Sequence, residues 1–129
     1  MLEIFMNYAT LWIVVGLIAA VLIFKQLSYI SPEAARKYLQ EGALVVDVRS
    51  VEEYRGEHLP MAMNIPLGDL QDSLPGRVKD KNQVLLLHCL SGTRSGIAKR
   101  QLKGMGYQNV FNLGSYGRAK SIVSGMRGN

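Results

Sequence analysis

The sequence predicts a parallel α/β sheet flanked by helices, preceded by one N-terminal transmembrane helix. Residues 43–49 and 83–89 are apolar runs without the strict alternation of a half-exposed strand, as is typical of central parallel strands. Segments with helix start and stop signals separate the predicted strands and indicate crossover connections. An uncharged apolar run from Ile4 to Phe24 precedes them.

The N-terminal apolar run is long enough to span a bilayer. At about 1.5 Å per residue, a helix from Ile4 to Phe24 is about 32 Å long, which matches a hydrocarbon core of about 30 Å. A cleaved signal peptide would carry a basic start, a shorter apolar run and a small-residue cleavage site, and a buried core helix would show a polar stripe. The predicted organisation is a retained anchor, a linker and one domain, at residues 1–25, 26–30 and 31–129.

The basic residues beside this run predict its orientation. Lys25, Arg36 and Lys37 follow the run and no lysine or arginine precedes it, so the positive-inside rule places the domain in the cytoplasm. A single cysteine, which cannot form an internal disulfide, agrees with a reducing compartment. The chain is therefore predicted to be a single-pass membrane protein whose first partner is the lipid bilayer.

The charge distribution argues against nucleic-acid binding. The net charge of +5 arises from 15 basic and 10 acidic residues scattered along the chain. No arginine-rich run with interleaved aromatic residues is present, and Lys99, Arg100 and Lys103 have the spacing of one solvated helix face. Without a cysteine and histidine cluster at ligand spacing, no metal is predicted, and no other cofactor.

The first element of the domain is a helix over residues 31–42. Ser31 is a typical N-cap, Pro32 suits the first helical position, and Gly42 gives the stop signal. The strand at residues 43–49 follows directly.

A second helix begins after Ser50, which forms a predicted capping box with Glu53. Residues 63–67 form a short predicted strand. A helical turn closed by Pro75 and Gly76 comes next.

The second half of the domain repeats the alternation of strand and helix. The strand at residues 83–89 is followed by a helix that starts at about Ser95 and ends at Gly104 and Gly106. Residues 109–114 form the last predicted strand, and a terminal helix is expected after it.

The only cysteine lies where chemistry is expected. Cys89 ends the strand at residues 83–89, and open α/β sheets bind their ligands at the carboxyl ends of their strands. Gly92 permits a tight turn that can gather backbone amides, and the following helix directs its positive end at the sulfur. Both effects lower a thiol pKa. A buried structural cysteine is the alternative, whereas His88 is expected to pack inside the strand.

Two segments resemble the rhodanese-like sulfurtransferases. "VVDVRSVEEYRGEHLPMAMNIPL" is similar to that family's first signature, and "CLSGTRSG" is similar to its active-site loop. The resemblance covers about residues 31–114 and implies one domain with a five-stranded parallel sheet flanked by helices. Glu57, Met61 and Ser115 stand where the family usually has glycines.

The resemblance also implies a reaction and residue roles. Cys89 would take a sulfur atom from a donor such as thiosulfate or a persulfide, hold it as a persulfide, and pass it to a thiol, to cyanide or to a sulfur-accepting protein. Arg94 would bind an anionic donor or stabilise the departing group, and Asp47 and Arg49 would form a supporting charge pair. The implied substrate-binding loop comprises Leu90, Ser91, Gly92, Thr93, Arg94 and Ser95.

Two alternatives to sulfur transfer remain open from the sequence. One is a membrane-tethered binding or scaffold module that keeps the loop but does not turn over. The other is a cysteine-dependent phosphatase, whose loop has the spacing Cys-x5-Arg. The spacing from Cys89 to Arg94 is Cys-x4-Arg, and this smaller ring suits one sulfur atom better than a phosphate.

Overall fold

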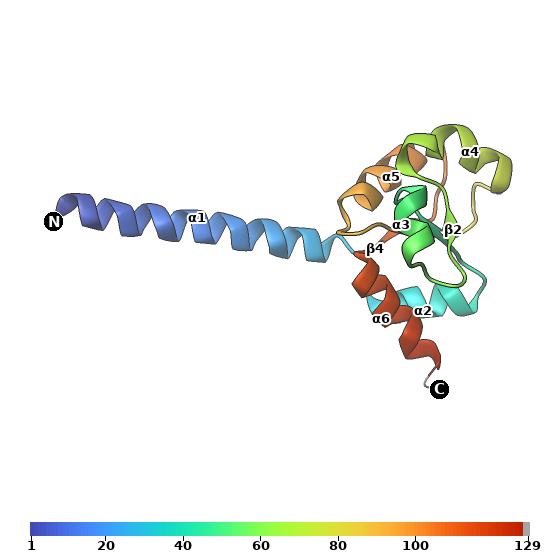
Figure 1. The fold of residues 1–129 in the computed structure, drawn as a ribbon, viewed down its shortest axis with the longest axis horizontal. Coiled ribbons are helices and arrows are strands. Elements are labelled where there is room, and N and C mark those ends of the chain that lie inside the picture. The colour runs from blue at the N-terminus through green and yellow to red at the C-terminus, as the bar shows by residue number, and fades with distance from the viewer. Residues whose placement is uncertain (128–129) are drawn as a thin grey trace.

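The computed structural model describes residues 1–127 and divides them between a long N-terminal helix and one α/β domain (Figure 1). Helix α1 (Leu2–Leu27) projects away from the domain, so the N-terminus lies far from the sheet. The domain elements are α2 (Pro32–Gln40), β1 (Leu44–Asp47), α3 (Val51–Gly56), β2 (Met63–Asn64), η1 (Leu67–Asp69), α4 (Leu70–Arg77), β3 (Leu85–His88), α5 (Thr93–Gly104), β4 (Val110–Gly114) and α6 (Tyr116–Arg127).

The strands form the parallel sheet that the sequence predicts. Their order is β2-β1-β3-β4, so the two apolar runs form the two inner strands. Asp47 at the end of β1 pairs with Asn64 in β2 and with His88 in β3. This register places the carboxyl ends of the inner strands side by side, next to Cys89 and the loop that follows it.

The sheet has four strands, and the expected fifth strand is absent from residues 1–127. Beside β4, Ile30 donates one backbone hydrogen bond of 3.0 Å to the carbonyl oxygen of Asn112. Helix α1 runs to Leu27 and α2 begins at Pro32, so only a few residues remain between them. That segment is too short to form a ladder of hydrogen bonds.

Apolar side chains cover both faces of the sheet. Leu85 and Leu87 of β3 point into one cluster with α4 and α5, and Leu86 points into another with α2 and α6. Residues along a strand alternate between faces, so the continuous apolar run of β3 is what a strand covered on both sides requires.

Local signals position the helices, with differences at two ends. Ser31 caps α2, and Ser50 with Glu53 forms the predicted capping box of α3. Pro75 and Gly76 do not close α4, which continues to Arg77, and the buried Leu74 packs its last turn into the core. Helix α5 begins at Thr93, two residues before the predicted start.

The terminal helix α6 packs against the sheet through Ala119, Ile122 and Val123. Ser115 precedes this helix, and its hydroxyl accepts a hydrogen bond of 3.1 Å from the backbone N–H of Arg118. Ser115, at a position where the resemblance implies a glycine, therefore acts as a helix cap.

Helix α1 has no buried side chain, and its apolar side chains are exposed. Phe5, for example, is 71% exposed and Trp12 is 70% exposed. It continues to Leu27, into the segment predicted as a linker. Within residues 1–127, it is the one helix long and apolar enough to cross a membrane by length and composition.

The charge pair expected from Asp47 and Arg49 forms inside the domain. The Arg49 guanidinium donates to both carboxylate oxygens of Asp47 at 2.7–3.0 Å and to the carbonyl oxygen of Glu57 at 2.7 Å. Asp47 is completely buried and Arg49 is 4% exposed. The pair links the end of β1 to the segment after α3.

Replacing Asp47 by alanine is expected to lower the free energy of unfolding by about 3–5 kcal/mol, because Arg49 would stay buried without its counter-charge. Urea unfolding of the full chain in detergent, followed by circular dichroism, measures the change. The exposed Glu41→Ala variant is the control and should change it by less than about 0.5 kcal/mol. Equal effects of the two variants would contradict the supporting role of the pair.

Candidate active site

Cys89 lies directly after β3, at the bottom of the loop that leads into α5. The residue is 1% exposed. Its sulfur accepts a hydrogen bond of 2.9 Å from the backbone N–H of Gly92, and the hydroxyl oxygen of Ser95 lies 3.5 Å from it. The thiol is therefore buried, but it is in contact with polar donors and not enclosed by hydrocarbon alone.

The backbone of Gly92 gives the loop its shape. Its φ angle of +92° lies in the left-handed region. Glycine adopts this region without strain because it has no Cβ atom, whereas other residues are strained there. A Cβ atom at this position would overlap the hydroxyl group of Tyr29. Gly92 thus serves the tight turn expected from the sequence, and Tyr29 closes that turn from outside.

Asn112 of β4 braces this turn from the other side. Its Nδ2 donates to the Gly92 carbonyl oxygen at 3.1 Å, and its Oδ1 accepts from the Ser95 hydroxyl at 2.7 Å. A hydroxyl has one proton, so Ser95 donates to Asn112 while Cys89 is neutral. A Cys89 thiolate would attract this proton more strongly than the Asn112 oxygen does, because hydrogen bonds to charged acceptors are stronger than those to neutral acceptors.

These contacts act on the pKa of the Cys89 thiol. Burial raises the pKa, while hydrogen bonds from the Ser95 hydroxyl and from the backbone N–H groups of Ser95, Ser91 and Gly92 lower it. The net direction is downward. The loop therefore favours a negative sulfur atom in a site that excludes water.

Arg94 is held by a carboxylate from a different helix. Its guanidinium donates to Glu53 of α3 at 2.6 and 3.0 Å, with the Arg94 side chain 34% exposed. The hydrogen bond from Arg94 and those from Ser50 lower the pKa of Glu53 to about 2. Glu53 is consequently ionised at neutral pH and offsets part of the positive charge expected at the loop.

The other loop residues are held by neighbouring elements. Leu90 is 58% exposed, and its carbonyl oxygen accepts from the backbone N–H of Tyr116 at 3.3 Å. The Tyr29 hydroxyl donates to the Ser91 carbonyl oxygen at 3.3 Å. Lys25 Nζ donates to the hydroxyl oxygen of Thr93 at 3.2 Å. The Thr93 hydroxyl and the Arg94 guanidinium are therefore engaged by Lys25 and Glu53, and neither hydrogen-bonds to the sulfur within residues 1–127.

His88 packs inside the domain, as the sequence suggests. It is completely buried, and its Nε2 lies 3.7 Å from the Asp47 carboxylate. Burial lowers the pKa of His88 more strongly than Asp47 raises it. A neutral imidazole at pH 7 follows, which suits packing better than proton transfer.

Several contacts of the loop have little or no signal in the sequence. Asn112 is visible as a polar residue inside an apolar strand, and Glu53 is recognisable only as a helix cap. Lys25 and Tyr29 follow the apolar run and carry no pattern that links them to Cys89.

The arrangement of strand end, left-handed glycine and buried thiol can be compared with known proteins. The family described as the Rhodanese-like domain matches residues 31–117. The chain belongs to this family. The match begins with the N-cap of α2 and ends in the first turn of α6, so α1 lies outside it.

Individual relatives agree with the family. The chain is 42% identical to the thiosulfate sulfurtransferase PspE of Escherichia coli over 54% of its own length and 66% of the relative's, just under two thirds. A solved structure titled "rhodanese with anions from E. coli" is 38% identical, with a TM-score of 0.58, over 60% of this chain and 91% of the other. The human single-domain sulfurtransferase TSTD1 is 25% identical, with a TM-score of 0.62, over 73% and 96%.

The lowered pKa predicts how Cys89 reacts with a small alkylating reagent. The rate should rise with pH to a midpoint below the ordinary thiol value of about 8.5, because the thiolate is the reactive form. Burial slows the reaction at every pH but does not move the midpoint.

Ser95→Ala should move this midpoint upward, since the hydroxyl that can turn to the thiolate is lost. Thr93→Val is the matched control, because the Thr93 hydroxyl faces Lys25, and it should leave the midpoint in place. A wild-type midpoint at or above about 8.5 would show that the loop does not stabilise the thiolate.

Proposed function

We propose that this chain is a membrane-anchored sulfurtransferase in which Cys89 carries the transferred sulfur. The observation that carries the proposal is the hydrogen bond of 2.9 Å from Gly92 to the Cys89 sulfur, in a loop that lowers the thiol pKa. The name of the relative PspE, a thiosulfate sulfurtransferase, supports the same reaction class.

The proposed reaction has two transfer steps, in the manner of covalent catalysis. With thiosulfate as donor, the Cys89 thiolate attacks the outer sulfur, a new S–S bond forms, and sulfite leaves with the electron pair of the broken bond. The loop then holds a Cys89 persulfide anion. An acceptor thiolate or cyanide attacks the outer sulfur of that persulfide and restores the Cys89 thiolate.

Arg94 has a defined place in this proposal. Glu53 engages two of the five N–H groups of the Arg94 guanidinium. The remaining N–H groups can bind an anionic sulfur-donating substrate or the departing sulfite. The same pair ties the loop to α3, so Arg94 also positions the loop. Asp47 and Arg49 act through the fold and not on the sulfur.

The membrane location is a further part of the proposal. An apolar helix of 26 residues with no buried side chain is not stable in water without a partner, and the bilayer can provide one. The basic residues that follow the proposed span favour the cytoplasmic face for the domain. The donor and the acceptor, a small thiol, cyanide or a sulfur-accepting protein, would meet Cys89 there.

Formation of thiocyanate from thiosulfate and cyanide tests the reaction. Wild-type full chain in detergent should turn over, and Cys89→Ser should lose activity by about a thousandfold or more, because the nucleophile is missing. Circular dichroism controls for folding of the variant.

Two companion measurements distinguish the alternatives, the intact mass of the thiosulfate-treated chain and an aryl phosphate hydrolysis assay. Loading of sulfur onto Cys89 without transfer to any acceptor would indicate a binding or scaffold module. Hydrolysis of an aryl phosphate without sulfur loading would indicate a phosphatase and contradict the proposal.

The location and orientation have their own test. The chain should remain in membranes washed with alkaline carbonate, and protease added to intact cells should leave the domain uncut. Cleavage of the domain in intact cells would reverse the predicted orientation, and release by carbonate would contradict the span.

A further inference from the structure

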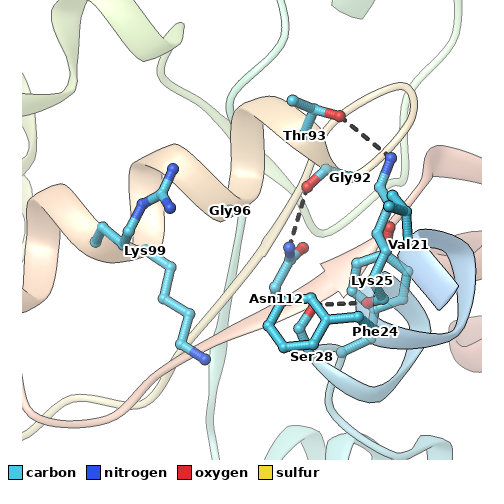
Figure 2. Close-up of a pocket in the computed structure, with 11 residues that line it drawn as sticks. Val21, Phe24, Lys25, Ser28, Gly92, Thr93, Gly96, Lys99 and Asn112 are labelled. Carbon is cyan, nitrogen blue, oxygen red and sulfur yellow. Dashed lines mark hydrogen bonds between the residues drawn. The ribbon is translucent and has the colours of Figure 1, made fainter. Parts of the chain in front are cut away.

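A cavity of about 530 Å³ lies between the end of α1 and the start of α5 (Figure 2). Its volume lies in the range of about 300–1,000 Å³ that is usual for small-molecule sites. Val21, Phe24 and Lys25 line it from α1, and Gly96, Lys99 and Arg100 line it from α5. The cavity is separate from Cys89, which does not line it, but it shares Gly92 and Thr93 with the loop.

The charged side chains of this cavity are all positive. Lys25, Lys99 and Arg100 line it, and none of its lining residues is acidic. Within residues 1–127, none of these three cations forms an ion pair. Burial, and after it the neighbouring Lys103, lowers the pKa of Lys99. An anion bound here would supply the missing counter-charge.

Val21 and Phe24 form an apolar side of the cavity that continues along α1, while Ser28, Thr93 and Asn112 add polar groups on the side of the loop. Val21 also lines a second hollow on the surface of α1, together with Leu17, Ile18 and Leu22. The hollow leads away from the domain into the apolar run. A ligand that fills both parts needs an anionic head and a hydrocarbon chain.

The position of the cavity relative to the proposed span agrees with this shape. The uncharged run ends at Phe24, and Lys25 follows it immediately. The cavity therefore lies at the depth of the lipid headgroups, where basic residues attract anionic lipids.

We propose that this cavity binds an anionic phospholipid, with its phosphate attracted by the basic side chains of Lys25, Lys99 and Arg100 and an acyl chain along Val21 and the hollow of α1. The inference rests on the membrane span of the proposed function and not on sulfur transfer. Because Lys25 also donates to Thr93, a bound phosphate lies next to a contact that joins the anchor to the active-site loop (Figure 2).

Titration of the detergent-solubilised full chain with phosphatidylglycerol, followed by native mass spectrometry, tests the site. One molecule of phosphatidylglycerol should bind per chain, more tightly than phosphatidylcholine with the same acyl chains. The double variant Lys99→Gln and Arg100→Gln should weaken the affinity for phosphatidylglycerol by about tenfold or more, because each cation near an anionic headgroup contributes about 1 kcal/mol.

The matched control is Arg77→Gln combined with Lys79→Gln. It removes the same charge from the end of α4, on the far side of the domain from α1 (Figure 1), and should leave the affinity unchanged. Equal weakening by both double variants, or equal binding of the two lipids, would overturn the proposal.

Two further measurements distinguish lipid binding from binding of a free anion and from the proposed sulfur transfer. Inorganic phosphate should not displace the lipid, and displacement would assign the site to a free anion instead. Cys89→Ser should abolish sulfur transfer and keep lipid binding, so failure of the lipid site and failure of the proposed reaction are distinguishable.

Discussion

The hydrogen bond from the Gly92 backbone to the Cys89 sulfur is the contact on which the site depends. A hydrogen bond to a charged group contributes about 1.5–3 kcal/mol, which offsets part of the cost of burying a thiolate. The bond requires Gly92 in a left-handed conformation. Asn112 holds this conformation from β4, and Tyr29 covers it from the segment between α1 and α2. The surroundings of the Cys89 sulfur therefore depend on the sheet and on the segment that follows α1 together.

The end of α1 and the residues just after it are joined to the loop by contacts that a flexible tether would not make. Lys25 and Tyr29 stand just after the apolar run, and each hydrogen-bonds to a residue of the loop, Thr93 and Ser91 respectively. A membrane-spanning α1 would hold the loop close to the headgroups. The position of the proposed lipid cavity follows from the same contacts.

The sequence predicts what depends on local or periodic signals. The caps at Ser31 and Ser50, the inner strands and the place of Cys89 follow from short segments and are confirmed by the structure. The pairing of Arg94 with Glu53 joins residues far apart in the chain, and no local pattern indicates it. The prediction of a fifth strand was wrong. It came from the family's usual number of strands, whereas in this chain α1 extends to within a few residues of α2.

The most direct test of the account is the mass of the protein isolated from its own cells under non-reducing conditions. If the loop holds a sulfur anion, a fraction of the chain should be heavier by one sulfur atom, and peptide mapping should place that atom on Cys89. Treatment with cyanide should remove it. A thiol that carries no added sulfur in cells supplied with thiosulfate would contradict the account.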